Sequence, residues 1–215
     1  MKGISFGNIH SYNDLHLLLT PFTPSPAQPQ TNFLKVIGRD GYLDLTEANG
    51  EVKFDSREFT FRFIVAPNDD MTFDERVAYV SKLLNGRQFK ITLDRDPGFY
   101  WMGRCIVNKY VQNKVIGEVI VKAFVDPYKY KQIATVVTVA ASSGGRTVEL
   151  ENSRMSAIPI IECANSGVTA TFKGKAYPLQ SGRNRILDIR LVEGRNAITL
   201  TGTGTVTITW QEGVL

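Results

Sequence analysis

The stretch that decides the fold of this chain reads Phe33-Leu-Lys-Val-Ile-Gly-Arg-Asp-Gly-Tyr-Leu-Asp-Leu-Thr-Glu47 and, a little further on, Arg57-Glu-Phe-Thr-Phe-Arg-Phe-Ile-Val65. A short apolar strand over residues 33–37 is expected to lead into a turn over residues 38–41. Glycine takes positive φ at little cost, and Asp can bond its own backbone. After Arg57, phenylalanines alternate with polar residues, which indicates a half-buried strand. None of these side chains is chemically reactive, so we interpret the stretch as a scaffold.

One amphipathic helix is expected after this strand. Thr72-Phe-Asp-Glu75 matches a capping box, in which the hydroxyl and the carboxylate satisfy free backbone amides reciprocally. Phe73, Val77, Val80 and Leu84 lie at helical spacing and predict one apolar stripe. Asn85-Gly86 predicts the end of the helix. The polar face carries charges of both signs, which speaks against a helix that lies on a membrane surface.

The chain then returns to strands. Apolar residues alternate over residues 89–93, and the runs 100–111 and 115–125 are expected to pair as an antiparallel hairpin around a loop at residues 112–114. Asp-Pro-Tyr-Lys-Tyr at residues 126–130 interrupts the pattern. We place the domain boundary there.

The rest of the chain carries only short strands, with no helix between them. They are expected at residues 133–140, 147–151, 157–163, 168–172, 186–192, 197–200 and 205–210. Strands at this spacing, joined by Gly and Asn turns, predict a small antiparallel β-sandwich. The predicted fold is therefore mainly β: a β-barrel or sheet domain with one α-helix over residues 1–128, followed by a β-sandwich over residues 129–215.

Composition speaks against several classes of partner. The 25 basic and 21 acidic side chains give a net charge of +4, which is too slight and too dispersed for a nucleic-acid site. The densest basic stretch contains Arg183, Arg185, Arg190 and Arg195, and we interpret it as a solvated face or a subunit contact. No apolar run approaches the ~20 residues that span a bilayer, and no signal peptide is evident at the start. We expect synthesis in a cytoplasm, without nucleic acid or membrane insertion.

No catalytic, cofactor or metal site is expected. His10 and His16 lie near Asp14, but no nucleophile occupies an elbow such as G-x-S-x-G. Asp94 and Asp96 form the best carboxylate pair for a glycosidase or a calcium site, and turn residues explain them better. No glycine-rich loop of the dinucleotide-binding kind precedes a helix. We therefore predict that the chain is not an enzyme.

Five further side chains have both a structural and a functional interpretation. Cys105 and Cys163 show no metal-binding spacing and are interpreted as small buried apolar residues. Tyr100, Trp101 and Trp210 are more typical of a core, but would stack on sugar rings if they were exposed. The alternative function is therefore a carbohydrate-binding adhesin that recognises host cell-wall polysaccharide.

Several motifs occur in a characteristic order and spacing. They are Gly3-Ile-Ser-Phe-Gly7, Tyr12-Asn-Asp-Leu15, Gly38-Arg-Asp-Gly-Tyr-Leu-Asp-Leu-Thr-Glu47, Arg57 before its aromatic run, Gly194-Arg-Asn-Ala-Ile-Thr-Leu-Thr-Gly202 and Val206-Thr-Ile-Thr-Trp210. In these motifs the chain resembles the distal tail proteins of long-tailed, non-contractile bacteriophages and prophages. The resemblance rests above all on residues 38–47.

The resemblance implies a fold, an assembly and partners. It implies that residues 1–128 form a ring domain like that of tail tube proteins, and that residues 129–215 form a galectin-like sandwich. The copies would make a hexameric ring at the virion tail tip. This ring would join the tail tube protein to the tail-associated lysin or tip hub protein and carry the receptor-binding protein. No catalytic residues are implied.

Two segments are candidates for subunit contacts. The resemblance places near such contacts the residues Gly38, Arg39, Asp40, Gly41, Leu43 and Asp44, together with Pro24 and Pro26 of the proline-rich segment. Proline cannot donate to a sheet ladder, so that segment is expected to be extended. Its residues alone leave open whether it reaches a neighbouring subunit or only links two strands. No loop after residue 133 is long enough for an inserted carbohydrate-binding module.

Overall fold

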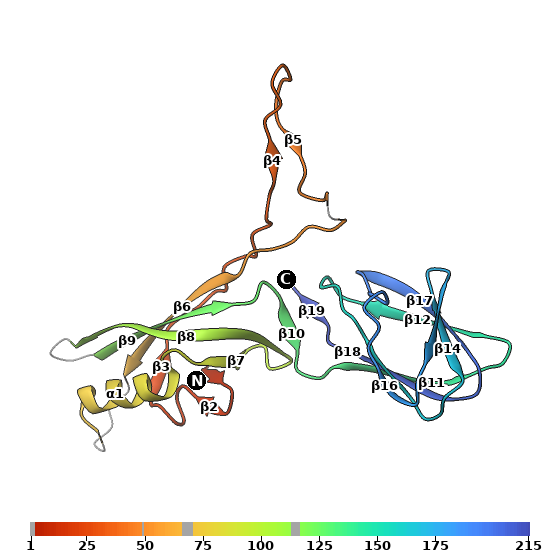
Figure 1. Cartoon of the computed structure of the whole chain (residues 1–215). Coiled ribbons are helices and arrows are strands. Elements are labelled where there is room, and N and C mark those ends of the chain that lie inside the picture. The colour runs from red at the N-terminus through yellow and green to blue at the C-terminus, as the bar shows by residue number, and fades with distance from the viewer. Residues whose placement is uncertain (1–2, 49, 66–70, 113–116) are drawn as a thin grey trace. The chain divides into compact units, whose positions relative to one another are not determined.

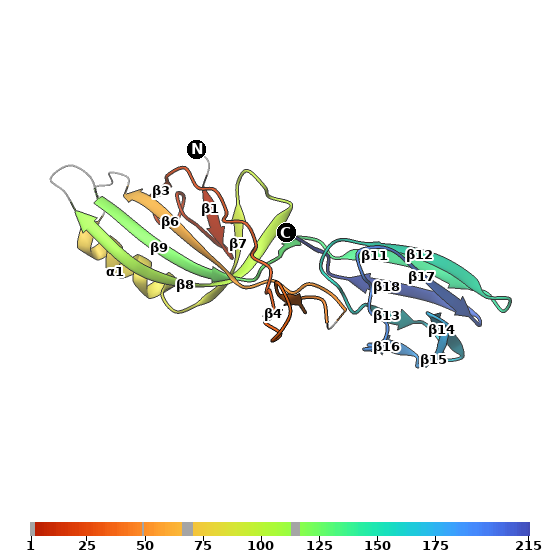
Figure 2. The same ribbon diagram turned by 90° about the horizontal axis from the view of Figure 1, so that it is seen from above.

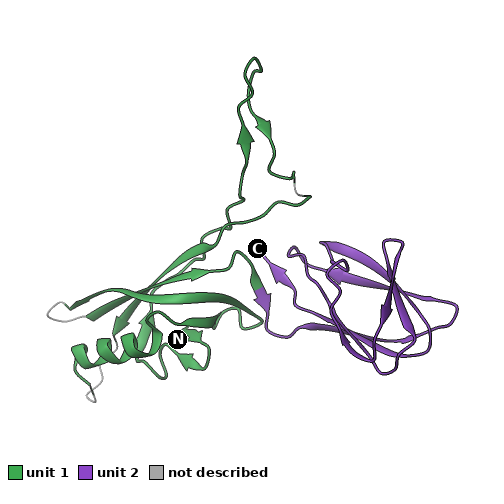
Figure 3. Cartoon of the chain, in the orientation of Figure 1, with its two compact units in different colours: residues 1–129, 215 green, residues 130–214 purple. Residues whose placement is uncertain are grey.

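The computed structural model describes residues 3–48, 50–65, 71–112 and 117–215. It divides into two compact units, of which unit 1 comprises Met1–Lys129 with Leu215 and unit 2 comprises Tyr130–Val214 (Figure 3). Both units consist mainly of antiparallel strands, which confirms the predicted fold class. The division lies next to the expected boundary between residues 128 and 129. That the two units act as separate domains stays a prediction.

Unit 1 is built on one curved antiparallel sheet with the strand order β2-β1-β7-β8-β9-β6-β3 (Figures 1 and 2). Its strands are β1 (Ile4–Phe6), β2 (Ile9–His10), β3 (Leu17–Leu19), β6 (Arg57–Val65), β7 (Gln88–Leu93), β8 (Phe99–Gln112) and β9 (Gly117–Val125). The expected hairpin is thus formed by β8 and β9, whose pairing shifts by one residue between Val107 and Lys109. Of the loop expected at residues 112–114, residues 113 and 114 lie outside the described residues, and Gln112 is the last residue of β8.

The core of unit 1 forms on one face of this sheet. The alternating Phe59, Phe61 and Phe63 of β6 are fully buried there, as their spacing predicts. Phe6 packs edge-on against Phe61, with 6.0 Å between the ring centroids. Removing such a ring from water contributes about 1.5–3 kcal/mol. This aromatic strand therefore organises unit 1.

Helix α1 (Phe73–Leu84) covers the same face, with Val77, Val80 and Leu84 turned into the core. The expected capping box is present: the Thr72 hydroxyl accepts a hydrogen bond from the Glu75 amide, and the Glu75 carboxylate accepts one from the Thr72 amide at 2.9 Å. These backbone and hydroxyl hydrogen bonds from Thr72 lower the pKa of Glu75. No helix in the described ranges is long and apolar enough to cross a membrane.

Unit 2 is a sandwich of two antiparallel sheets with the strand orders β11-β18-β13-β16 and β12-β17-β14-β15. Their bounds are β11 (Thr135–Ala141), β12 (Arg146–Asn152), β13 (Ile160–Cys163), β14 (Val168–Phe172), β15 (Lys175–Leu179), β16 (Gly182–Asn184), β17 (Gly194–Thr201) and β18 (Gly204–Trp210). Buried side chains from both sheets form one core between them. Two further short strands, β10 (Lys129–Lys131) and β19 (Gly213–Val214), pair with each other. This pair brings the first residues of unit 2 next to its last residues. The galectin-like detail stays a prediction.

One expected strand is wrong. Residues 186–192 form an irregular loop instead, with a turn at residues 187–188 across which the Ile189 amide donates to the Ile186 carbonyl at 3.1 Å. Ile189 and Leu191 are fully buried, and Leu191 touches Ala157 through an isolated bridge. The apolar residues of this loop thus pack into the core of unit 2. They alternate in the sequence because they are buried, and not because the segment is a strand.

Candidate assembly interface

The most exposed apolar side chains of unit 1 lie on an arm that stands away from the sheet (Figure 1). The arm comprises residues 28–48 and 50–55 and carries two short paired strands, β4 (Phe33–Leu34) and β5 (Leu43–Asp44). The apolar strand expected over residues 33–37 is therefore shorter than predicted. Every residue from 28 to 42 is exposed. The fractional exposure is 101% for Ile37, 65% for Tyr42 and 55% for Phe33.

Local backbone bonds shape the arm. At its tip Gly38 and Gly41 adopt positive φ, at 83° and 76°, as the expected turn requires. Further down, the Asp44 carboxylate accepts from the Thr46 amide at 2.9 Å. The side-chain and backbone hydrogen bonds from Thr46 lower the pKa of Asp44. At the base, Pro29 and Phe54 form a bridge that closes the arm.

Two properties of the arm are unfavourable in an isolated chain: its low intrinsic stability and its exposed apolar side chains. A two-stranded hairpin alone is marginally stable in water, and a cluster of exposed apolar side chains usually marks an interaction site. Phe33 and Tyr42 lie side by side on the arm, with 6.4 Å between ring centroids, and present one apolar surface. The candidate contact residues Gly38, Arg39, Asp40, Gly41, Leu43 and Asp44 all belong to this arm. The arm is therefore the strongest candidate interface.

The proline-rich segment is anchored along β6 before it reaches the arm. Thr20 Oγ1 donates to the Arg62 carbonyl at 3.0 Å, and Phe22 stacks on Phe61 with 4.6 Å between centroids. Pro24 is half-buried and Pro26 is exposed. The segment thus links β3 to the arm and leaves Pro26 on the surface. Whether Pro24 and Pro26 contact a neighbouring subunit stays a prediction.

A second uncovered surface is the sheet face opposite α1. It carries the outward residues of β6, β8 and β9, among which Phe124 and Ile106 are exposed. Cross-strand ion pairs surround them: Lys122 Nζ lies 2.6 Å from a Glu58 carboxylate oxygen, and Arg62 lies 3.5 Å from Glu118. The face is therefore charged in both signs, without a basic stripe.

The sugar-stacking candidates are buried. Fractional exposure is 7% for Tyr100, 4% for Trp101 and 3% for Trp210. Stacking on a sugar requires an open ring face. The condition under which these residues would bind a sugar is not met, and nothing in the described structure favours the adhesin.

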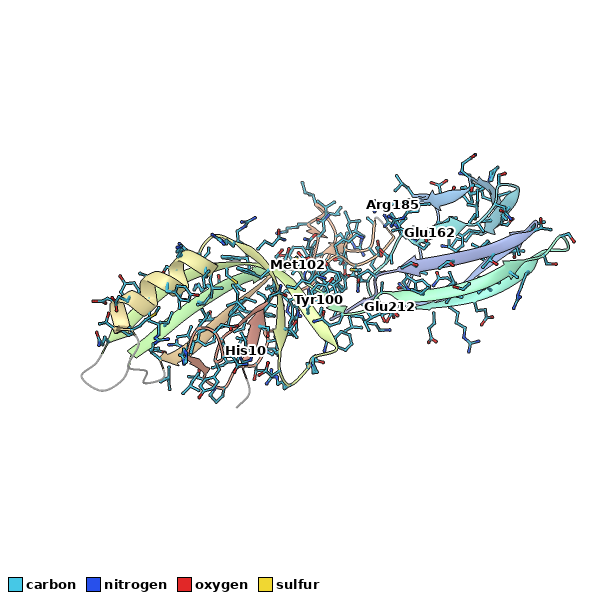
Figure 4. All side chains as sticks on the ribbon, turned by 90° about the horizontal axis from the view of Figure 1, so that it is seen from below. His10, Tyr100, Met102, Glu162, Arg185 and Glu212 are labelled. Carbon is cyan, nitrogen blue, oxygen red and sulfur yellow. The ribbon has the colours of Figure 1, made fainter. Side chains whose placement is uncertain are left out.

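The candidate acid–base residues act separately. The Asp94 carboxylate accepts from the Gly3 amide at 2.6 Å and lies 3.2 Å from Nε2 of His10, a residue labelled in Figure 4. Asp94 therefore connects the start of β1 to the end of β7. Asp96 instead pairs with Lys129 at 2.7 Å. Asp94 and Asp96 thus have different partners, and both carboxylates have a structural role in these contacts. Within the described ranges, no group of three or more His, Cys, Asp or Glu residues is placed to hold a metal ion.

Neither cysteine is suited to nucleophilic chemistry. Cys105 and Cys163 are both buried, as their surroundings in the sequence predict. Burial raises the pKa of the Cys105 thiol to about 12 and also raises that of Cys163. The thiolate, which is the nucleophile, is therefore disfavoured in both.

The basic stretch of unit 2 is exposed and partly paired. Arg183 lies 3.0 Å from Glu162, and Arg195 lies 3.6 Å from Glu149. Arg185 (Figure 4) and Arg190 are exposed as well. Paired, separated charges of this kind fit a solvated face. A subunit contact there stays a prediction.

Sequence reasoning missed one feature of Arg57. The arginine entered only as a marker of the aromatic strand, yet it is 8% exposed and its guanidinium lies 5.2 Å from the centroid of the Phe59 ring. The available signal was a cation in phase with three alternating aromatic residues, because Arg57, Phe59, Phe61 and Phe63 share one face of the strand.

The structure thus shows a mainly β protein with a strand-rich core and an exposed apolar arm. Residues 8–139 match the family described as phage tail protein RIFT-related domain, and the chain belongs to this family. No curated protein matches the chain. Among solved structures, the SPP1 Dit protein (gp 19.1) is similar, with a TM-score of 0.70 and 16% identity over 100% of each chain. That protein is described as a paradigm of the hub adsorption apparatus in Gram-positive-infecting phages. The chain is therefore a phage tail protein with a Dit-like fold, which confirms the predicted resemblance.

Proposed function

We propose that this chain is a structural distal tail protein that forms a homohexameric ring at the tip of a virion tail. The observation that carries the proposal is the exposed apolar arm on a chain with a Dit-like fold. Fully burying Ile37 or Tyr42 against a neighbour would contribute about 1.5–3 kcal/mol for each side chain. Residues Gly38 to Asp44 of one copy then contact the next copy, together with Pro24 and Pro26.

A ring also accounts for the ends of the sheet. β2 and β3 are the terminal strands of the unit 1 order, so each has one side without a ladder partner in that order. Edge strands of this kind are prone to pair with another chain. An arm that contacts a different surface of the next copy makes a head-to-tail interface, and such interfaces close into rings when the rotation permits.

The partners follow from the same proposal. The ring connects the tail tube protein to the tail-associated lysin or tip hub protein and serves as a platform for the receptor-binding protein. Unit 2 is a galectin-like domain that supports this platform. The protein has no enzymatic activity and is made in the cytoplasm of the bacterial host before it enters the virion.

The test is the mass of the purified protein across a concentration series, combined with negative-stain imaging. We expect six-fold rings for the wild type. Ile37→Asp places a charge on the apolar arm, and we expect assembly to require at least about tenfold more protein, or about 1.4 kcal/mol.

Ile133→Asp is the matched control. Ile133 is 83% exposed in unit 2 and lies outside the arm, so the same change there should leave assembly unaltered. A wild type that stays a single chain at all concentrations, also when its tail partners are added, would refute the ring. Equal effects of the two substitutions would refute the role of the arm.

A further inference from the structure

Arg57 is a buried cation held only by neutral groups. It is the first residue of β6, and its guanidinium donates to the Pro127 carbonyl at 3.1 Å and to the Ser25 carbonyl. The guanidinium carbon also lies over two aromatic rings, 5.2 Å from the centroid of Phe59 and 5.9 Å from that of Trp101. These contacts position the guanidinium without neutralising its charge.

No acidic side chain compensates Arg57 in the described part of the chain. None of the ion pairs there includes it, and its Nε–H has no acceptor. Burial lowers the pKa of the guanidinium. The indole Nε1–H of Trp101 is likewise buried without an acceptor. A buried charge without a counter-charge, and buried donors without acceptors, each cost free energy.

Both side chains line one small pocket of unit 1. Its volume is about 270 Å³, and Arg95 and Lys129 also contribute to its wall. Lys129 is neutralised by Asp96, with 2.7 Å between their charged atoms, whereas Arg95 belongs to none of the ion pairs found in the described ranges. Asp96 and Leu215 line the pocket as well, and the three cationic side chains of the wall outnumber its one acidic side chain, so the side chains carry an excess of positive charge. Pockets for drug-sized ligands usually enclose roughly 300–1,000 Å³, so this one suits a smaller group.

We propose that this pocket, the Arg57 pocket, binds a carboxylate. A carboxylate supplies the missing negative charge and acceptor oxygens, and its planar pair of oxygens matches a guanidinium. The small volume fits an acidic side chain or a small free carboxylic acid. In the first case the acid comes from a neighbouring protein chain, and the second part of the test below distinguishes the two sources.

Trp101 provides a direct reporter of the pocket. The chain has two tryptophans, so in a Trp210→Phe background the remaining indole N–H resonance belongs to Trp101. The protein is diluted until mass measurement shows a single chain, and is then titrated with sodium acetate against sodium chloride at equal ionic strength. We expect acetate alone to shift the resonance, saturably, with a dissociation constant of about 1–10 mM.

Arg95→Gln tests the pocket without disturbing the core, because Arg95 is exposed. It should weaken acetate binding about two- to fivefold. Arg87→Gln, another exposed arginine of unit 1 that does not line the pocket, is the matched control and should change nothing. A Trp101 resonance that responds equally to acetate and chloride, or that shifts identically in Arg95→Gln and the wild type, would overturn the proposal.

The source of the carboxylate is tested by raising the protein concentration without acetate. If a neighbouring copy supplies the acid, the resonance moves to the acetate-bound position as the mass rises. If it does not move while acetate still shifts it, the ligand is a free carboxylate or the acid of another protein. Assembly is followed separately by mass, so failure of the pocket and failure of the ring are distinguishable.

Discussion

Glu212 offers the sharpest test of how unit 2 is held together. It is 5% exposed, and its carboxylate accepts hydrogen bonds from Lys131 Nζ, Thr135 Oγ1 and Ser153 Oγ (Figure 4). Lys131 and Thr135 lie at the start of unit 2 and Ser153 directly follows β12, whereas Glu212 lies near the end of the chain. The carboxylate therefore ties the entering segment to the leaving one.

The magnitude follows from the donors that lose a charged acceptor. Hydrogen bonds to charged groups contribute about 1.5–3 kcal/mol each, and the ion pair with half-exposed Lys131 adds less because of solvent screening. Glu212→Gln keeps the volume and one carbonyl oxygen, so we expect a loss of about 2–4 kcal/mol. For a unit of this size, this corresponds to a Tm decrease of roughly 10–25 °C.

The assay is thermal unfolding, with fluorescence of Trp210 for unit 2 and of Trp101 for unit 1, each read in a variant that lacks the other tryptophan. Glu193→Gln is the matched control, because Glu193 pairs with Arg154 at an exposed site and such pairs contribute about 0–1 kcal/mol. The reasoning is refuted if Glu212→Gln and Glu193→Gln lower the Tm of unit 2 equally, or if unit 1 loses as much stability as unit 2.

Three shorter predictions concern unit 1. Gly103→Ala places a Cβ at 2.4 Å from Val125 Cγ1, so we expect it to lower the free energy of unfolding by about 1–3 kcal/mol, measured by thermal unfolding. Gly98→Ala is the control: its Cβ meets open space, and the stability should change little. Thr72→Ala removes the helix cap and should cost about 0.5–2 kcal/mol, measured by denaturant unfolding; a loss below this range would mean that solvent replaces the cap. The Cys105 thiol, with its raised pKa and full burial, should react with a thiol reagent only after unfolding; reaction in the folded protein would contradict the core position.

Local patterns in the sequence predicted those parts of the fold that local chemistry determines. The phenylalanines of residues 59–63 alternate because one sheet face is buried, and Thr72 with Glu75 forms a cap within a single turn. Residues 186–192 misled the prediction because Ile189 and Leu191 are apolar for a tertiary reason: they fill the sandwich core from a loop. Periodicity over so few residues does not separate these two causes of burial.

The sequence indicated where the candidate interface lies, but it did not indicate that the apolar side chains of this interface are exposed. Residues 38–47 were identified through motif resemblance, and the apolar residues before them were interpreted as part of a scaffold. Only the structure shows that Ile37 and Tyr42 are exposed, because exposure depends on which other elements fold back on a segment. The unpaired guanidinium of Arg57 is hidden in the same way, since its missing partner is an absence among distant residues rather than a local pattern.

The pH dependence of the stability of unit 2 is an independent test of the contribution of the Glu212 carboxylate. Burial raises the pKa of this carboxyl, but hydrogen bonds from Lys131, Ser153 and Thr135 outweigh it, so the pKa is lowered in the folded state. A lowered folded pKa means that the stabilisation is present above the unfolded pKa, about 4.3, and is lost as pH falls through the folded value. The Tm of unit 2 should therefore drop more steeply below about pH 4.3 in the wild type than in Glu212→Gln. Parallel acid profiles for the two proteins would mean that the carboxylate charge contributes nothing, and the hydrogen bonds alone would then have to account for any loss in the variant.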